Sequence, residues 1–377
     1  MSIIKRLSNE LEKPRDQRPL GSGWLSGGGA LLAGLTGLLL VLVLKLPGSF
    51  VTPDLMAIHD SGYLRPFLHI VLLIGYGLAL LSLLLSKDKV LGGTALALVV
   101  VASLLGGSQT TTSDANPTSL YFGLDFFILN VLFVGFLFVP LERFFPHRAD
   151  QTVFRPEWQE DMFYYLISSM LVQVLTFLTL APANFVTGAV DLSAIRTQVA
   201  GLPFAVQVLI IMVVTDFAQY WFHRMFHQVP WLWKFHAVHH SARSMDWLAG
   251  ARMHIIEIAL LRGLTALPMF TLGFDPAAIQ VYVLIVYFYS SLVHANLRWD
   301  FKAIEKVLVT PRFHHWHHGK EKEAIDVNFA IHFPLYDRLF GTHHMPEGRW
   351  PKDYGVGGDP VPLGYWKQFL YPFRKSS

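Results

Sequence analysis

Apolar residues gather in long blocks along this chain instead of being dispersed among polar ones. Eight of these blocks approach the ~20 residues that a helix needs to cross the hydrocarbon core of a bilayer. The blocks are Gly28–Leu46, Leu68–Ser86, Val90–Gly107, Phe122–Leu141, Phe163–Ala183, Phe204–Phe222, Ile255–Phe274 and Ala277–Val293. The pattern therefore predicts an all-α, polytopic membrane protein with eight spanning helices.

The composition supports this class and excludes several others. Charged residues make up 15% of the 377 residues, whereas a soluble domain typically carries ~25%. The absence of cysteine excludes disulfide frameworks, thiolate zinc sites, cysteine-ligated iron–sulfur clusters and a cysteine nucleophile. A net charge of +3, without a basic tract, gives no reason to expect a nucleic-acid partner.

The distribution of basic residues predicts which side of the membrane each segment faces. Short loops rich in Lys and Arg stay in the cytoplasm. Basic residues before the first block place the N-terminus inside, and they are Lys5, Arg6, Lys13, Arg15 and Arg18. No A-x-A-like cleavage site follows that block, so we expect a retained helix and not a signal peptide. Counting crossings from there places all the histidine motifs at the cytoplasmic face, in a helical cap.

We expect three regions along the chain. Residues 1–120 hold spans without a chemical motif, and residues 121–346 hold the other spans and nearly all the unusual polar residues. Residues 347–377 form a tail rich in Pro, Gly and aromatic residues. Because Trp and Tyr favour the boundary between membrane and water, we expect this tail at the interface.

Eleven of the 17 histidines lie between residues 223 and 318, most of them in three motifs. The motifs are HRMFH (His223, His227), HAVHH (His236, His239, His240) and HHWHH (His314, His315, His317, His318). Residues three and four apart share a helix face, so the first histidine of each H-x-x-H-H should meet both of the last pair. His315 should then point elsewhere. Imidazole is the commonest metal-ligand side chain, and eight converging imidazoles exceed the needs of one ion, so two metal ions are implied.

Other polar residues are candidates for the same site. His294 follows the last apolar block at the same depth and is a further candidate ligand. Asp216 and Tyr220 share a helix face with His223, so we expect them to orient imidazoles by hydrogen bonding; Asp216 could instead cap the helix or pair with Arg224. In RMHIIE (252–257), His254 and Glu257 are spaced to hydrogen-bond to each other beside the site.

The ligand types leave the metal open. No H-E-x-x-H or E-x-x-H pair occurs, so neither a zinc protease nor a ferritin-like carboxylate site is indicated. Imidazole suits zinc, copper, iron or nickel, and residue type alone does not choose between them.

Four segments resemble the fatty acid hydroxylase/sterol desaturase superfamily, whose members are membrane enzymes with a histidine-rich di-iron centre. The likeness runs from about residue 121 to 346 and implies that residues 121–346 form the catalytic domain. The segments are DFAQYWFHRMFHQVPWLWKFHAVHHS (216–241), VHANL (293–297), TPRFHHWHH (310–318) and NFAIHFPLYDRLFGT (328–342).

The resemblance implies a function and a ligand set. The chain is expected to hydroxylate or desaturate a lipid C–H bond with O2 as co-substrate and two iron ions as cofactor. Electrons would come from an external donor, namely a ferredoxin, a cytochrome b5-like carrier or a reductase. The implied iron ligands, eight matching motif positions and His294 matching a further frequent histidine, are His223, His227, His236, His239, His240, His294, His314, His317 and His318. The sequence departs from some relatives at Ser290, where they carry one more histidine.

Non-redox functions form the alternative. The same histidines could hold zinc in a membrane hydrolase, for which Glu257 or Asp216 would have to act as general base. A metal transporter would be expected to carry ionisable residues in mid-span, and these blocks have almost none apart from His69 and Asp125.

Overall fold

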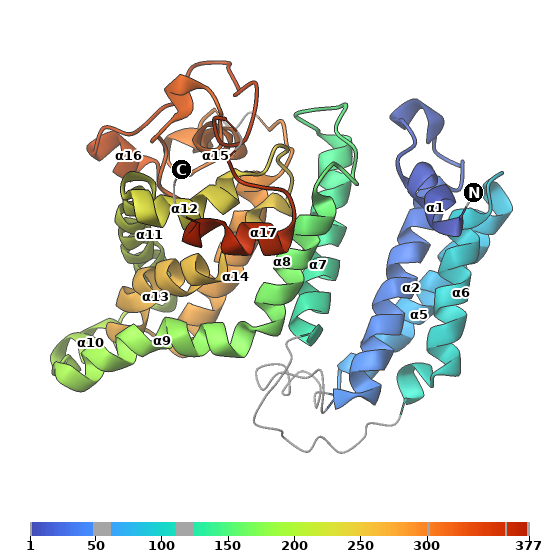
Figure 1. The fold of residues 1–377 in the computed structure, drawn as a ribbon. Helices are drawn as coiled ribbons and strands as arrows, with labels where there is room; N and C mark the ends of the chain where they lie inside the picture. The colour runs from blue at the N-terminus through green and yellow to red at the C-terminus, as the bar shows by residue number, and fades with distance from the viewer. Residues whose placement is uncertain (1, 48–61, 111–123, 300–301, 359, 375–377) are drawn as a thin grey trace. The chain divides into compact units, whose positions relative to one another are not determined.

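The computed structural model describes residues 2–47, 62–110, 124–299, 302–358 and 360–374. The chain forms two compact units (Figure 1). Unit 1 comprises residues 1–136, 151–154 and 169–171, and unit 2 comprises residues 137–150, 155–168 and 172–377. The boundary expected at residue 120 lies outside the described residues.

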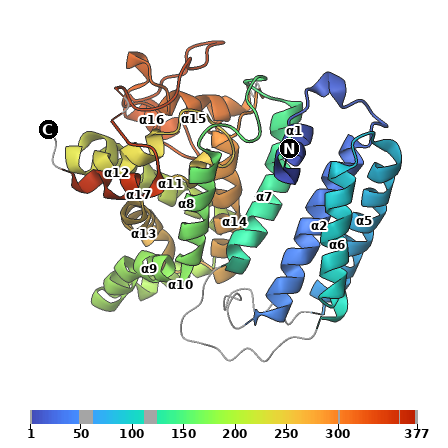
Figure 2. The same ribbon diagram turned by 45° about the vertical axis from the view of Figure 1, so that its right-hand side comes forward.

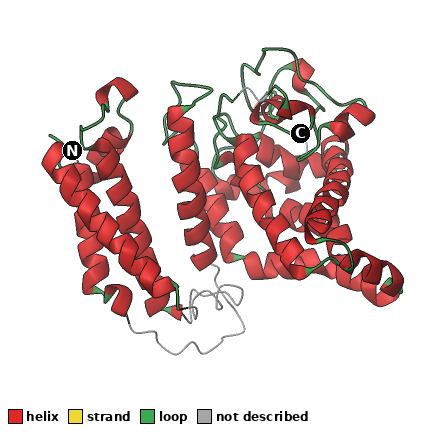
Figure 3. Ribbon diagram, turned by 180° about the vertical axis from the view of Figure 1, so that it is seen from behind, coloured by secondary structure: helices red, strands yellow, loops and turns green. Residues whose placement is uncertain are grey.

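The described residues fold into helices and loops without a strand (Figure 3). The α-helices are α1 (Ile3–Leu11), α2 (Trp24–Lys45), α5 (Leu64–Leu85), α6 (Val90–Leu104), α7 (Leu124–Phe144), α8 (Trp158–Met170), α9 (Val172–Ala189), α10 (Ser193–Ala200), α11 (Phe204–Gln228), α12 (Pro230–His240), α13 (Ile255–Thr271), α14 (Pro276–His294), α15 (Pro311–His317), α16 (Leu335–Leu339) and α17 (Tyr365–Leu370). Short 3₁₀ turns include η3 (Ala249–Ala251), η5 (Lys322–Ala324) and η6 (Tyr371–Phe373). The predicted all-α class is confirmed.

Unit 1 is a bundle of α2, α5 and α6 in which small residues let the helices approach closely. A Cβ atom added to Gly37 would lie 2.5 Å from the Leu72 side chain, and one added to Gly34 would lie 3.1 Å from the Ala95 carbonyl oxygen. Such small-residue contacts are typical of helices packed within a membrane. Unit 1 carries none of the nine expected ligands.

Unit 2 positions the histidine motifs at one end of its long helices. α11 packs against α12, α13 and α14, and α14 also packs against α15. Figures 1 and 2 show α12, α15 and α17 at one end of this group, and α9 and α10 at the other. His223 and His227 lie in the last turns of α11, and His294 ends α14. The short helices α12 and α15 therefore form a cap that carries the remaining motif histidines over the ends of the long ones.

Five helical segments of the described chain are long and apolar enough to cross a membrane. They are Trp24–Lys45, Leu64–Leu85, Val90–Gln109, Phe204–Gln228 and Pro276–His294. A bent pair, Phe177–Ala189 with Ser193–Ala200, meets the test jointly at an angle of 119° and would raise the number to six. The multi-pass prediction is confirmed, whereas the cytoplasmic orientation of the cap stays a prediction.

The expected number of eight spans is therefore too high for the described residues. The block Phe163–Ala183 is divided between α8 and α9 because the helix is interrupted at Leu171. The block Ile255–Phe274 gives α13, which has 17 residues and is short of the ~20 needed. The block Phe122–Leu141 corresponds to α7, but its first two residues lie outside the described residues.

The tail after residue 347 folds over the cap. The Arg349 carbonyl accepts a hydrogen bond from Trp316 Nε1, and the Tyr354 hydroxyl lies 2.8 Å from His315 Nδ1. Trp366, at 67% exposure, projects outward from α17. The expected location of the tail at the membrane interface stays a prediction.

Candidate metal centre

The nine expected ligands come together in two groups. The first cluster is His223, His227, His236, His240 and His317, and the second cluster is His239, His294, His314 and His318. Within each cluster, one ring nitrogen from every histidine lies within 4.8 Å of the others. Three separate stretches of chain thus meet at one place, and they form two adjoining sets of imidazoles.

Each H-x-x-H-H motif is divided between the two clusters. In α12, His236 and His240 join the first cluster while His239 joins the second. In α15 the assignment is reversed, because His314 joins His318 in the second cluster and His317 joins the first. The first histidine of each motif contacts both of the last pair, as expected, with ring centroids 4.7–5.4 Å apart, but it shares a cluster only with the one four positions on. Positions three and four further on lie to opposite sides of the first residue, roughly 100° apart around the helix axis, so each motif contributes to both clusters.

Hydrogen bonds at Nδ1 orient most of these rings. Carbonyl oxygens lie 2.7–3.0 Å from Nδ1 in four of them, and the pairs are His223 with Phe329, His239 with Arg252, His294 with Ser290 and His317 with Val327. Carboxylate oxygens lie near Nδ1 of two more, and the pairs are His236 with Glu257 and His227 with Asp326. Since a carbonyl oxygen only accepts, Nδ1 of those four rings carries the proton and Nε2 presents its lone pair to the cluster. Metal-ligating histidines are held in this way.

The Nε2 atoms lie close to one another without suitable partners. His223 and His236 approach to 2.9 Å through Nε2, and His314 and His294 approach to 3.1 Å. The buried Nε2 atoms of His227 and His317 have no hydrogen-bond partner. Two lone pairs facing each other repel, whereas a cation between them satisfies both, so the residues present fit a metal ion in each cluster.

Burial keeps the cap imidazoles neutral. Desolvation lowers the pKa of His236, His239 and His240 in α12 well below the usual value of 6.5. It also lowers the pKa of His314, His317 and His318. Neighbouring imidazoles add to these shifts because a charge on one disfavours a charge on the next. Neutral imidazole is the form that binds a metal.

Two further candidate histidines lie outside both clusters. His315 points away, as expected, and its Nδ1 lies 2.8 Å from the Tyr354 hydroxyl. His254 begins α13, where its Nδ1 accepts a hydrogen bond from the Ile256 backbone and its Nε2 lies 3.0 Å from the Phe369 carbonyl oxygen. His254 therefore anchors the C-terminal segment. Its expected partner Glu257 contacts His236 instead.

Asp216 and Tyr220 do not orient imidazoles directly. The buried Asp216 carboxylate accepts hydrogen bonds from the backbone N–H groups of Ile331, His332 and Phe333. The Tyr220 hydroxyl lies 2.9 Å from Thr342 Oγ1. Both side chains bind the segment after α15, and Asp216 turns to it because three unpaired backbone donors there need an acceptor.

A buried ion network fixes the segment that supports the second cluster. The Arg155 side chain binds Asp246 over 2.7 Å and Asp161 over 2.5 Å, and Arg252 binds Asp161 and Glu157. Residues 246–252 are thus held at both ends, and the Arg252 carbonyl oxygen lies 3.0 Å from His239 Nδ1. Sequence reasoning missed this network, and also the carbonyl acceptors, because a backbone oxygen leaves no signal in residue type.

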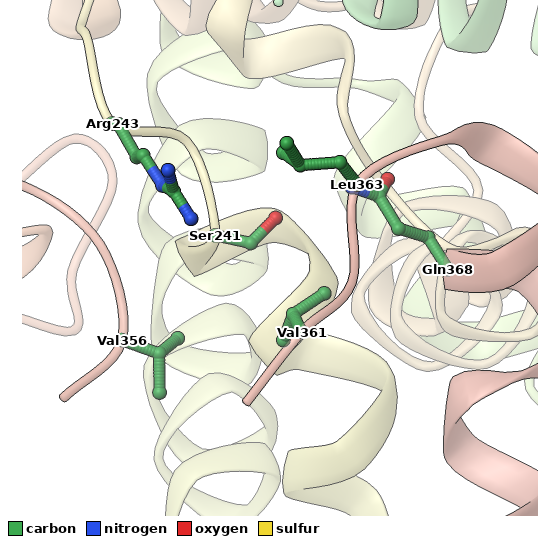
Figure 4. A pocket seen from close by; sticks show the side chains of 6 residues that line it. All are labelled: Ser241, Arg243, Val356, Val361, Leu363 and Gln368. Atoms are coloured by element: carbon green, nitrogen blue, oxygen red, sulfur yellow. The ribbon is translucent and has the colours of Figure 1, made fainter. Parts of the chain in front are cut away.

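A small cavity lies between the end of α12 and the C-terminal segment (Figure 4). Its lining residues are Ser241, Arg243, Val356, Val361, Leu363 and Gln368. The cavity volume of about 10 Å³ accommodates about one water molecule. It is too small to hold a lipid chain.

This fold and these clusters define a class of protein: a helical, multi-pass membrane protein with two buried imidazole groups at one end of its spans. Residues 208–342, which include all nine clustered histidines, match the family model described as fatty acid hydroxylase. This domain match and the lipid-hydroxylase relatives support the fatty acid hydroxylase/sterol desaturase superfamily, as the motifs indicated.

Similar curated proteins share this domain over part of their length. An ornithine lipid hydroxylase of Rhizobium tropici is 30% identical over 174 residues, which are 46% of this chain and 52% of that protein. Alkylglycerol monooxygenases of Xenopus tropicalis and Homo sapiens are 33% and 31% identical, over 35% and 34% of this chain and 29% and 28% of those proteins. The chain thus matches about half or less of the length of these relatives. No solved structure shows a significant match.

Proposed function

We propose that this chain is a membrane-bound oxygenase that hydroxylates a lipid C–H bond with O2, with one iron ion held by each histidine cluster. The observation that carries the proposal is the pair of clusters, in which nine imidazoles direct ring nitrogens at one another. The names of the relatives, an ornithine lipid hydroxylase and alkylglycerol monooxygenases, support a lipid substrate and an oxygenase reaction.

Iron bound at these clusters would supply the change in oxidation state that oxidising an unactivated C–H bond requires and that zinc lacks. Hydroxylation converts R–H, O2, two electrons and two protons into R–OH and water. The electrons need a carrier, because the chain has no cysteine for an iron–sulfur cluster and no G-x-G-x-x-G motif. We propose a ferredoxin, a cytochrome b5-like protein or a reductase as the donor.

Residues of the chain itself orient the ligands and exclude water. Nδ1 hydrogen bonds hold the rings, as described above. The Phe329 ring, which is fully buried, lies with its centroid 5.0–5.8 Å from those of His223, His227 and His317. This apolar wall keeps water from one side of the first cluster. A lipid could reach such a site sideways from the bilayer, since the clusters lie at the ends of the spans.

The zinc hydrolase alternative would need Asp216 or Glu257 as general base, and neither side chain is placed for that role. Both carboxylate oxygens of Asp216 accept backbone hydrogen bonds. Glu257 binds Nδ1 of His236, on the ring edge opposite the Nε2 that meets His223. Neither acid is directed at the space that a metal-bound water would occupy.

The test combines metal analysis with lipidomics of membranes that contain the wild-type chain or His317→Ala. A wild-type-specific lipid that has gained one oxygen atom would establish hydroxylation, and a lipid that has lost two hydrogen atoms would identify desaturation instead. Purified protein with zinc as its active metal, or hydrolysed lipids as the only change, would overturn the proposal.

A further inference from the structure

One short segment, residues 326–329, contacts three of the five histidines of the first cluster. Asp326 Oδ1 lies 3.3 Å from His227 Nδ1. The carbonyl oxygens of Val327 and Phe329 lie 2.8 Å from Nδ1 of His317 and of His223. The two Nδ1 partners given above for the second cluster come from other segments, at Arg252 and Ser290.

The backbone of this segment adopts an uncommon conformation. Asp326 and Asn328 both have φ of +58°, and they are two of the three non-glycine residues with positive φ in the described chain. Asn328 is fully buried and donates hydrogen bonds to the carbonyls of Phe313 and His344. The left-handed backbone conformation of Asp326 and Asn328 turns the carbonyl groups of Val327 and Phe329 toward the cluster. Such conformations persist where the surrounding structure enforces them.

The Asp326 side chain does not contribute to the packed interior. It is 49% exposed, and among the described residues its carboxylate contacts the ring of His227. Glycine adopts positive φ at no steric cost, so backbone conformation alone would favour glycine at this position. What aspartate adds is an acceptor for the His227 ring.

From these contacts we infer that residues 326–329 form a positioning loop for the first cluster, and that Asp326 orients His227 so that its Nε2 faces the metal ion. The inference rests on the proposed function, since it assumes that the clusters bind metal. Carbonyl and carboxylate acceptors at Nδ1 fix the tautomer and raise the basicity of the ligand. Asp326 is thus a positioning residue that acts through His227.

The experiment measures binding of Fe²⁺, without O2, to the full chain purified in detergent, with Asp326→Gly and Asp326→Asn as the matched pair. Glycine keeps the backbone conformation and removes the acceptor, whereas asparagine keeps an oxygen acceptor. We expect two ions in the wild type and in Asp326→Asn. In Asp326→Gly we expect one ion unchanged and the other bound about 10- to 100-fold more weakly.

Combining Asp326→Gly with a substitution in the second cluster shows which cluster holds the more weakly bound ion. His318→Ala damages only the second cluster, so the ion that it retains belongs to the first, and adding Asp326→Gly should weaken that remaining ion. Gly250→Ala serves as the opposite control, because a Cβ there would lie 3.0 Å from His294 Nδ1 and disturb the second cluster.

The outcomes separate the two proposals. Asp326→Gly that binds both ions as tightly as the wild type, or that loses both together, overturns the positioning loop and leaves the proposed function standing. A wild-type chain that binds fewer than two ions overturns the proposed function itself.

Discussion

Glu257 and His236 lie 21 positions apart on different helices, yet Glu257 Oε1 is 2.5 Å from His236 Nδ1. Both side chains are buried. The contact holds the proton on Nδ1, so that Nε2 of His236 meets the Nε2 atoms of His223 and His240. A carboxylate in α13 thereby orients a ligand in α12.

Removing this carboxylate should weaken metal binding. Glu257→Ala is expected to lower the affinity of one ion about 10- to 100-fold, a typical effect of losing an acceptor behind a ligand. Glu257→Gln, which keeps an amide oxygen, should retain most of the affinity. Metal titration of both variants tests this, and wild-type affinity in Glu257→Ala would contradict it.

Neighbouring histidines in α15 should respond differently to the same substitution. His317→Ala, and likewise His239→Ala in α12, should abolish lipid oxidation in a chain that still folds in detergent, because each removes a cluster member. His315→Ala should keep both ions and lose about 1–3 kcal/mol of stability with its Tyr354 contact. Metal content, product analysis and thermal unfolding separate these results. Full turnover in either His317→Ala or His239→Ala would refute the ligand assignment.

Asp216 is expected to contribute to the free energy of unfolding and not to set the tautomer of a histidine ligand. Asp216→Ala leaves three backbone N–H groups without their acceptor, so we expect a loss of about 3 kcal/mol or more. Tyr220→Phe removes one hydroxyl contact and should cost about 1 kcal/mol. Thermal unfolding in detergent measures both. Equal losses of stability in Asp216→Ala and Tyr220→Phe would show that the Asp216 hydrogen bonds stabilise the fold less than their geometry implies.

The buried histidines should make the metal-free protein sensitive to acid. Burial lowers the folded-state pKa of His236, His240, His314 and His318 well below 6.5. Below about pH 6.5 the unfolded chain therefore binds protons that the folded chain does not, and stability falls as pH falls. Each histidine that stays neutral contributes roughly 1.4 kcal/mol per pH unit in that range.

Thermal unfolding of the metal-free chain between about pH 7.5 and 5 tests this expectation. The midpoint should be nearly constant above the usual histidine pKa and should drop steadily below it. A midpoint that does not change on acidification would show that these imidazoles are already solvated in the folded state.

Residue type and spacing predicted much of this molecule. Long apolar blocks indicated membrane helices. Histidines spaced three and four residues apart indicated imidazoles grouped on helices. Block length could not show where a helix breaks: Phe163–Ala183 has the length of one span but forms parts of α8 and α9.

The contacts behind the ligands were harder to predict, because they depend on how distant segments meet. Asp216 shares a helix face with His223, yet its oxygens bind backbone at residues 331–333. Asp326 carries no motif, and its contact with His227 arises only when residues 99 positions apart are brought together. Helical spacing also could not show that a single motif contributes to two clusters.

The division of each motif between clusters has a consequence for synthesis on the ribosome. By the time residue 240 has emerged, the nascent chain already contains four of the five imidazoles of the first cluster. The second cluster then has a single imidazole, His239; His294 follows, and the last two, His314 and His318, arrive only with α15. The two clusters are thus completed by the same late helix, but one of them has nearly all its imidazoles long before the other.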